Sequence, residues 1–289
     1  MKLVAGLFLA IASACALNWG FFVQHAVAAE LPPLSVRRPV RSLRGLFGSG
    51  RWLLGYAVGI GGWGLYIVAL SLAPLSIVQA ASGGGIGVLA FLVFRARRET
   101  PSRREAAGVA AAMAGLVLLG VSLIHRASSS RAVPALGLAS WIAISLLIVA
   151  LLVAFAARSA VAGAAMGAAA GILYASGDIA TKGAFSSTHR IDFVLALLVC
   201  HGLGFVVLQR GFQLGNALQT AGLSTMLTNA LPIAAGIAIF HEGMPAGLLG
   251  VIRGMAFALV LVAAVVLARV PAPAHPTPRV EGPARAAIG

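Results

Sequence analysis

The sequence has few charged residues, and very few of these are acidic. Only 10% of the 289 residues are charged, with seven Asp and Glu in total, whereas 60% are hydrophobic and the mean hydropathy is +0.98. A soluble domain covers its surface with polar side chains, so this composition excludes that class. Lipid requires every backbone N–H and C=O to be paired internally, and the apolar runs are longer than barrel strands. The sequence therefore predicts an all-α polytopic membrane protein.

Cysteine is also scarce, and the motifs of cofactor-dependent enzymes are missing. Cys15 and Cys200 lie inside apolar runs without metal-ligand spacing, so we interpret both as small hydrophobic residues. No Walker-type phosphate loop occurs. The stretch 59–64 matches GxGxxG, but it lies within a spanning segment, where glycines let helices approach closely. We therefore expect no cofactor, no catalytic residues and no enzyme activity.

Long apolar segments are abundant. Nine have the length of about 20 residues that crosses a bilayer as a helix. They are residues 3–28, 52–72, 75–94, 106–124, 134–157, 161–184, 192–209, 214–240 and 245–268. Pro74 predicts a tight turn between the second and third segments. Residues 31–50 are expected to form a basic interfacial loop, and the Pro-rich residues 270–289 a disordered cytoplasmic tail.

The basic residues are distributed unevenly between alternate loops. If nine helices alternate, fifteen of the 21 basic residues fall on one side with the tail, and four fall on the other. This asymmetry predicts a cytoplasmic C-terminus and an outside N-terminus in a multi-pass protein of the plasma or inner membrane. Aromatic residues do not interleave with the arginines, so the net charge of +14 is not expected to bind nucleic acid.

The first apolar segment has a second interpretation. Lys2, the apolar run and the Ala-Val-Ala sequence at 26–28 resemble a cleavable signal peptide. The length of the run and the polar interruption at Asn18-Trp19-Gly20 favour a spanning helix instead.

The two halves of the chain show weak similarity to each other. A shift of 142 residues lays Gly62-Trp63 over Gly204-Phe205, and a shift of 160 lays Asn18 over Asp178. Helices one to four (residues 1–125) would then repeat as helices six to nine (161–268), connected by a fifth helix at 134–157. Because the offset of five helices is odd, the repeats must be inverted in the membrane, as in many secondary transporters.

These features resemble the drug/metabolite transporter superfamily and its EamA-type repeat. The similarity lies in the stretch 62–123, with Ala-Leu-Ser-Leu-Ala-Pro at 69–74, Glu99, Gly108, Gly115 and Gly120. It continues in Gly-Asp-Ile-Ala-Thr-Lys at 177–182, Asn-Ala-Leu-Pro-Ile at 229–233 and His-Glu-Gly at 241–243. The resemblance implies a transporter. Nine helices with an outside N-terminus are closer to the NIPA-type, magnesium-transporter-like branch than to ten-helix EamA proteins.

The sequence also departs from the EamA pattern. Arg97-Arg98 precede Glu99 at a place where that pattern usually has a glycine. The pattern has no family-wide marker residue, so the resemblance implies no substrate.

Three charged residues fall well within spans: Asp178, Lys182 and Arg253. Ionised groups in hydrocarbon cost about 2.5–3.5 kcal/mol each on insertion scales, so they normally face a cavity or a partner. Asp178 and Lys182 share a helix face with Tyr174. We expect Asp178 to face the bundle interior with Lys182 or Arg253 as its ion-pair partner. His201 is interpreted as a packing residue.

The eighth segment is rich in polar side chains. Ser224, Thr228 and Pro232 form an i, i+4 row next to Asn229, and this row either lines a solute path or forms hydrogen bonds between helices. The predicted pathway comprises Asn18, Trp19, Tyr174, Asp178, Lys182, Ser224, Thr228, Asn229 and Arg253. If a metal cation is carried, Asp178 and Glu242 are the candidate ligands.

Two classes of function remain open from the sequence. The first is secondary transport of a small solute or ion, with a divalent cation such as Mg²⁺ as the alternative cargo. The second is a membrane scaffold that does not transport, or an intramembrane enzyme. The expected partners are the lipid bilayer and a small-molecule or ion substrate, and a homodimer is compatible with the sequence.

Overall fold

The computed structural model describes residues 2–34, 44–73, 75–98, 100–123, 135–186, 190–239 and 245–269. Within these ranges the secondary structure is helical, without a strand. The helices are α1 (Lys2–Ala28), α3 (Gly50–Leu72), α4 (Leu75–Gly83), α5 (Gly85–Arg97), α6 (Arg103–Val121), α7 (Ala135–Ala156), α8 (Ala162–Ser186), α9 (Arg190–Leu214), α10 (Ala217–Ala238) and α11 (Leu248–Ala268).

Eight helical stretches in the described part of the chain are long and apolar enough to cross a membrane. The prediction of an all-α polytopic membrane protein is therefore confirmed. The helix α8 is not among the eight, because it is rich in Ala and Gly and carries Asp178 and Lys182. It packs against α7, α9 and α10.

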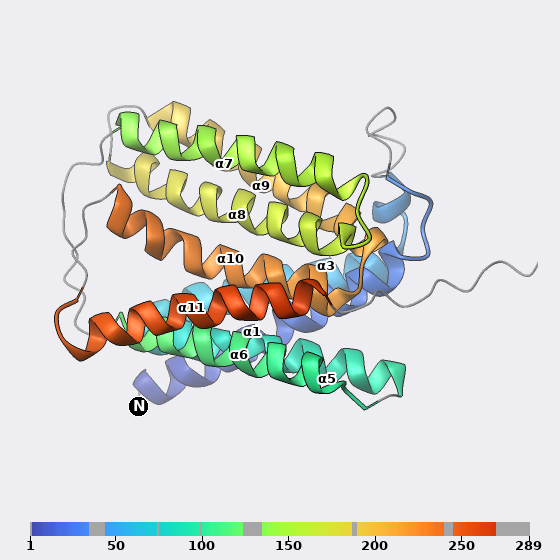
Figure 1. Cartoon of the computed structure of the whole chain (residues 1–289), viewed down its shortest axis with the longest axis horizontal. Coiled ribbons are helices and arrows are strands. Elements are labelled where there is room, and N and C mark those ends of the chain that lie inside the picture. Colours follow the sequence, from blue (N-terminus) through green and yellow to red (C-terminus); the bar gives the residue numbers. More distant parts are fainter. Residues whose placement is uncertain are drawn as a thin grey trace, which may run out of the picture.

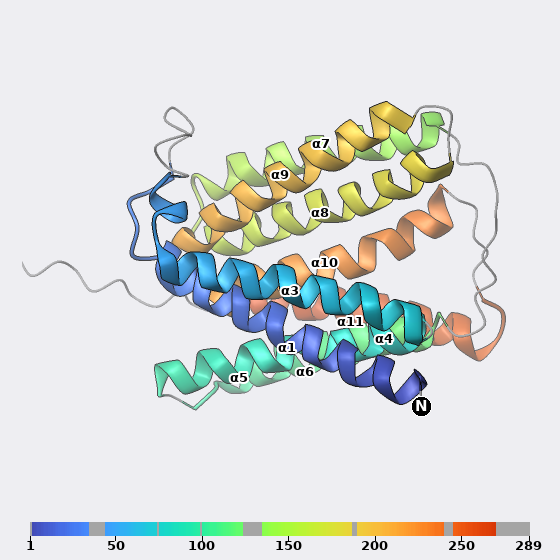
Figure 2. The same cartoon turned by 180° about the vertical axis from the view of Figure 1, so that it is seen from behind.

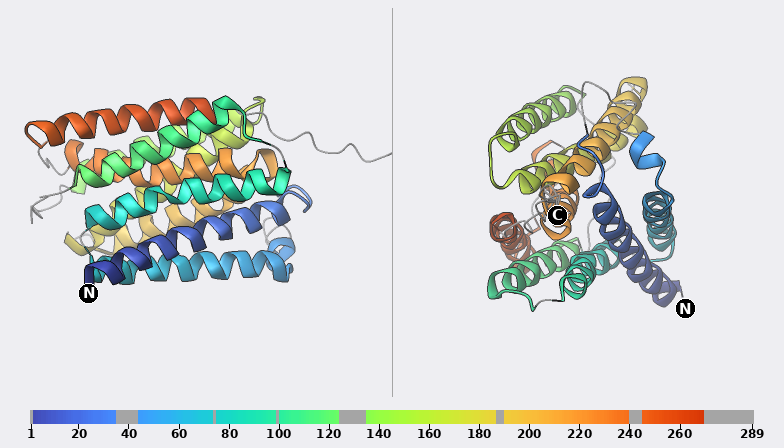
Figure 3. Two further views of the ribbon diagram at one scale, coloured as in Figure 1. Left: turned by 90° about the horizontal axis from the view of Figure 1, so that it is seen from below. Right: turned by 90° about the vertical axis from the view of Figure 1, so that its right-hand side faces the viewer.

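The helices lie roughly along one axis of the molecule and alternate in direction (Figure 1). The start of α1 lies at one end of the bundle and the end of α11 at the other (Figures 1 and 3). We call the end that contains the α5–α6 and α9–α10 links the basic end. Most of the described arginines lie there, namely Arg44, Arg51, Arg95, Arg97, Arg98, Arg103, Arg104, Arg158, Arg210 and Arg269.

Helix packing divides the chain into two groups. The largest helix contacts join α1 to α3 and α8 to α9, and Figure 2 shows both pairs side by side. The helix α10 lies between the group of α7, α8 and α9 and the remaining helices, and it has the largest buried share of the spans (Figure 1). The helices α6 and α11 pack closely on each other. By contrast, α7 packs mainly on α8 at the edge of the bundle.

Glycines bring α1 and α3 into close contact. A Cβ on Gly20 would lie 2.6 Å from the Gly55 carbonyl oxygen, and one on Gly62 would lie 3.0 Å from the Ala16 Cβ. Gly62 belongs to the GxGxxG stretch, which lies inside α3. This stretch is therefore a helix-packing surface, as the sequence predicts.

The third predicted segment differs from expectation. Residues 75–94 are not one continuous helix, because the chain turns at Gly84 between α4 and α5. The Gly84 N–H bonds the Ala81 carbonyl at 3.1 Å, which is a tighter turn than an α-helix makes. Flanking glycines allow neighbours to approach here: a Cβ on Gly83 would overlap Leu116 of α6, and one on Gly85 would overlap the Asn18 amide of α1. Pro74 lies outside the described residues.

Candidate functional site

A carboxylate and an imidazole lie close together between α8 and α9. Asp178 of α8 and His201 of α9 approach to 3.4 Å between Oδ1 and Nε2. Their side chains are 47% and 39% exposed, respectively. Gly177 permits this approach, because a Cβ there would overlap the His201 ring. The interpretation of His201 as a packing residue stays a prediction, and its contact with Asp178 was not foreseen because the two residues are distant in the sequence.

The second ring nitrogen of His201 also faces an oxygen. Nδ1 lies 3.2 Å from the Leu197 carbonyl oxygen, which can only accept. Nδ1 therefore donates to this carbonyl, and Nε2 faces the Asp178 Oδ1. The contact between the two side chains lowers the cost of placing them among apolar helices.

Tyrosine side chains lie near this pair. Tyr174 lies one helical turn before Asp178 on α8, and its ring centroid lies 5.6 Å from that of His201. Tyr66 of α3 is within electrostatic reach of the Asp178 carboxylate. Tyr56 of α3 is within electrostatic reach of Tyr174. Tyr174 lies one turn from Asp178 on α8, as the sequence predicts. Tyr56 and Tyr66 were not among the predicted residues, because they lie on another helix.

The aromatic residues continue from Tyr56 toward the basic end. Tyr56 stacks on Trp52 at a centroid distance of 5.2 Å and an interplanar angle of 10°. Phe205 of α9 packs edge-on against Tyr56 at 5.7 Å and against Trp52 at 5.9 Å. Phe47 lies 5.1 Å from Trp52. We call Phe47, Trp52, Tyr56 and Phe205 the aromatic column.

Of the two partners expected for Asp178, Arg253 bonds Ser122 instead, and nothing is described of the Lys182 side chain. Arg253, in α11, is 3% exposed. Its Nη2 donates to the Ser122 carbonyl at 2.7 Å and its Nε to the Ser122 Oγ at 3.2 Å. Ser122 is the C-terminal cap of α6, where the free carbonyls and the helix dipole stabilise a positive charge. Arg253 therefore ties α11 to α6.

The polar row of α10 faces α8. Ser224 is 3% exposed and its backbone contacts Gly171, while the Thr228 Oγ1 approaches the Gly171 carbonyl at 3.5 Å. Asn229 donates to the Thr225 carbonyl of its own helix at 2.8 Å. Of the two interpretations left open, contact between helices is the one these positions favour for Ser224 and Thr228.

Asn18 is buried on α1 away from the Asp178–His201 pair. It is 4% exposed, and its Nδ2 donates to the Ala14 carbonyl at 2.8 Å. Its Oδ1 is buried and has no hydrogen-bond partner among the residues that the structure describes. The neighbouring Trp19 is half-buried. Asn18 thus lies against the Gly84 turn rather than beside Asp178, its proposed repeat equivalent.

The side chains of two further candidate residues, Glu242 and Lys182, cannot be placed relative to Asp178. Glu242 lies outside the described residues, and nothing is described of the Lys182 side chain. Among the described residues, no group of three or more His, Cys, Asp or Glu side chains is placed to hold a metal ion. Asp178 and His201 are the described pair with which a cation could interact.

At the basic end, polar side chains join the two halves of the chain. The buried Gln209 of α9 accepts from the Trp52 Nε1 at 3.1 Å and donates to the Gln24 Oε1 at 2.8 Å. The His25 Nε2 lies 3.0 Å from the Gly215 carbonyl oxygen. Gln213 donates to the Ala28 carbonyl at 3.2 Å. We call these contacts the basic-end network.

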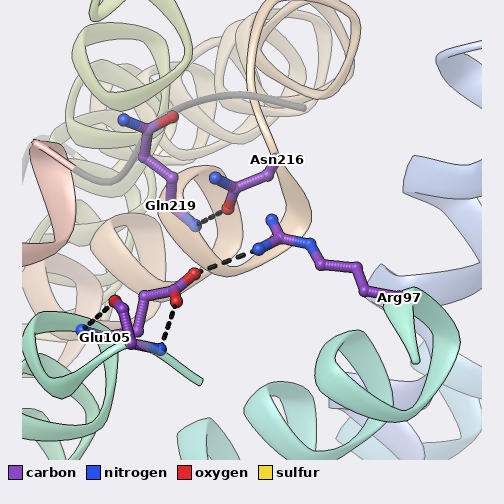
Figure 4. A network of polar contacts seen from close by, with 5 residues as sticks. Arg97, Glu105, Asn216 and Gln219 are labelled. Carbon is purple, nitrogen blue, oxygen red and sulfur yellow. Dashed lines mark hydrogen bonds and ion pairs between the residues drawn. The ribbon is translucent and has the colours of Figure 1, made fainter. Parts of the chain in front are cut away.

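A second set of polar contacts orders the α5–α6 and α9–α10 links (Figure 4). Arg97 pairs with Glu105 at 3.0 Å, and Glu105 forms a capping box with Ser102 at the start of α6. Asn216 caps α10 by accepting from the Gln219 N–H at 2.7 Å. Gln219 in turn donates to the Ala268 carbonyl at the end of α11 at 2.7 Å. Both links are thus held by local helix caps.

Comparison with known proteins finds a transporter relative. The chain is 25% identical to the probable magnesium transporter NIPA9 of Arabidopsis thaliana, over 82% of this chain and 74% of that protein. No family model matches the chain, and no solved structure does. Together with the eight apolar helices, the similarity bears out the prediction of a multi-pass membrane transporter.

Proposed function

We propose that the protein is a secondary transporter that moves a small solute along a path past Asp178 and His201. The observation that carries this proposal is a half-exposed carboxylate–imidazole contact between α8 and α9, within a bundle of apolar helices. Asp178 lies eight residues before the end of α8, which places it about 12 Å from that end. Ionisable side chains at such depth are costly, and they normally mark a substrate or ion pathway.

The helix packing supports the proposed inverted repeat. The first two helices of each half, α1 with α3 and α8 with α9, make the largest helix contacts. The last helices of the two halves, α6 and α11, pack on each other. In this arrangement α7 is the connecting helix. Superposition of α1 to α6 on α8 to α11 should give an axis in the membrane plane, and an axis along the normal would contradict the proposal.

In this conformation the two ends of the proposed path differ in how closely the two halves of the chain are joined. At the basic end the network of Gln24, Trp52 and Gln209 holds the first half against the second. Asp178 and His201 lie beyond this closure and remain exposed. We propose that alternating access opens the basic-end network while the opposite end closes.

We also propose that the basic end is cytoplasmic, because positively charged loops remain on that side during insertion. Reporter fusions after Arg131 and after Gly289 should then report from opposite sides of the membrane, with the second one inside. Two reporters on the same side would contradict the proposed topology.

The transport proposal is tested by flux measurements in proteoliposomes. The solutes are Mg²⁺, amino acids and organic cations, each with and without a proton gradient. Asp178→Asn should abolish the flux of the transported solute while the protein still inserts and folds. Glu30→Gln, at an exposed carboxylate beyond the end of α1, is the matched control and should transport normally. Full flux in Asp178→Asn would remove Asp178 from the pathway.

Magnesium transport is the second candidate, favoured by the printed name of the relative. Mg²⁺ prefers several oxygen ligands and retains much of its water shell. Among the described residues Asp178 has a histidine rather than a second carboxylate as its partner, so the ion would have to pass largely hydrated. Mg²⁺ influx that saturates and is lost in Asp178→Asn would support this cargo.

A further inference from the structure

We propose that the hairpin formed by α5 and α6 binds the headgroup of an anionic phospholipid, in the leaflet that the basic end faces. The headgroup contacts four arginines at the tip of this hairpin, which we call the arginine patch. They are Arg95, Arg98, Arg103 and Arg104. A lipid bound here is a partner of the protein, separate from a solute that passes Asp178 and His201.

The arginine patch carries an excess of positive charge. Its four members are exposed. The fifth arginine of the hairpin, Arg97, is instead paired with Glu105 at 3.0 Å, and the Glu105 carboxylate also accepts from the Ser102 N–H at 2.9 Å. Residues 95–105 contain five arginines and two glutamates, so the net charge of this segment is +3. An anion from outside the protein is therefore attracted to the patch.

Local contacts hold the hairpin in one shape. The contact between Arg97 and Glu105 joins the end of α5 to the first turn of α6, and the Ser102 Oγ accepts from the Glu105 N–H at 3.2 Å. Arg98 ends α5 in the left-handed region with φ 56°, and among the described residues no other non-glycine residue has a positive φ. The link between α5 and α6 lies at the outer edge of the bundle, where lipid can reach it (Figures 1 and 3).

An exposed aromatic ring lies one helical turn before the first arginine of the patch. Phe91 is 62% exposed and precedes Arg95 by four residues on α5, so the two side chains share a helix face. Because α5 runs toward the basic end, the ring lies deeper in the membrane than the guanidinium. A phospholipid has the same order, with apolar chains below a phosphate that a guanidinium can bond through two oxygens. This order favours a lipid over a soluble anion.

Native mass spectrometry of the purified full-length protein in detergent measures lipid binding. Dioleoylphosphatidylglycerol should bind about tenfold more tightly than dioleoylphosphatidylcholine, because its headgroup carries a net negative charge. The double variant Arg95→Gln, Arg98→Gln should weaken phosphatidylglycerol binding about tenfold and abolish the preference, and so should Arg103→Gln, Arg104→Gln. Phe91→Ala should weaken binding about threefold, because it removes apolar surface beside the acyl chains.

Each type of variant has a matched control. The double variant Arg158→Gln, Arg269→Gln removes the same charge from exposed positions at the basic end but outside the hairpin, and its phosphatidylglycerol binding should stay within about twofold. Phe155→Ala removes an exposed ring of α7 and should also stay within about twofold. Melting temperatures in the same detergent should be alike in all variants, because the replaced side chains are exposed.

Three outcomes would overturn the proposed lipid site. The first is equal binding of the two lipids. The second is a loss in the control double variant as large as in the patch variants, because binding would then follow the total charge of the basic end. The third is binding of glycerol phosphate as tight as that of phosphatidylglycerol and unaffected by Phe91→Ala, which would indicate a site for a soluble anion. The measurement involves no flux, so a failure of the proposed transport would leave its result unchanged.

Discussion

The basic end and the Asp178 site use similar polar residues for different purposes. At the basic end, Gln209 is fully buried and its amide bonds both Trp52 and Gln24. At the Asp178 site, the carboxylate and its histidine remain about half exposed. A buried group with its hydrogen bonds satisfied stabilises one packing of the helices. A polar group left accessible among apolar helices contributes less to packing and is available to a solute.

The same contrast separates the two charged residues that lie deep in spans. Arg253 is buried and bound to the cap of α6, whereas Asp178 is exposed and paired with a titratable side chain. Charge within a span is therefore not sufficient evidence for a pathway. We expect the partner and the exposure of the side chain to distinguish a structural from a functional role.

The largest effect on stability should come from the close helix contact in the basic half of α8. A Cβ on Gly167 would lie 2.4 Å from the Thr220 carbonyl oxygen of α10, so Gly167→Leu must push two backbones apart. We expect a loss of about 3 kcal/mol, seen as a lower melting temperature in detergent. Gly202→Leu, whose Cβ meets nothing within 4 Å, is the control. Equal melting of the two variants would contradict the packing of α8 on α10.

The next effect should come from the basic-end network. Gln209→Leu leaves the Trp52 Nε1 and the Gln24 Oε1 buried without their partner, at a cost of about 2 kcal/mol. Thermal denaturation in detergent measures the loss, with the exposed Ser140→Ala as the control. Unchanged melting of Gln209→Leu would indicate that the network does not hold the two halves together.

A smaller effect is expected at Arg253. Arg253→Met keeps much of the side-chain volume and removes the buried charge, so the stability should change by about 1 kcal/mol or less in either direction. Solute flux should stay within about twofold of the unchanged protein, because Arg253 is bound to Ser122 rather than to Asp178. Loss of flux with an unchanged melting temperature would indicate that Arg253 takes part in transport.

The smallest effect on stability is expected at Asp178. Because its side chain is half exposed, Asp178→Asn should change the free energy of unfolding by about 0.5 kcal/mol or less, although it should abolish flux. Melting and flux measured on one purified sample test this. A large drop in melting temperature would indicate that Asp178 stabilises the helix packing, as Gln209 does.

Much of the fold was predictable from the sequence. The apolar runs predicted the helices to within a few residues, because spanning length depends on local composition alone. The third predicted segment is divided at Gly84 into α4 and α5, although Ala80–Arg97 still has the length and hydropathy of a span. Three neighbouring glycines signal a weak point, but the contacts of Gly83 with Leu116 and of Gly85 with Asn18 come from other helices.

The site was only partly predictable. Asp178 and Tyr174 stood out, because a carboxylate within a span is rare and residues four apart share a helix face. The partner of Asp178 was not predictable, since the choice among Lys182, Arg253 and His201 depends on how the helices are rotated. Gly177 was the available signal, because a glycine next to Asp178 lets the ring of His201 approach.

The sequence alone determined that this chain is a multi-span helical membrane protein with a strong charge asymmetry, because hydropathy and charge act locally on each segment. Only the tertiary structure decided that Asp178 pairs with His201, that Arg253 caps α6 and that Gln209 joins the two halves. These pairings depend on glycine contacts and helix rotations that combine residues far apart in the chain. Such pairings cannot be inferred from apolar segments of similar composition.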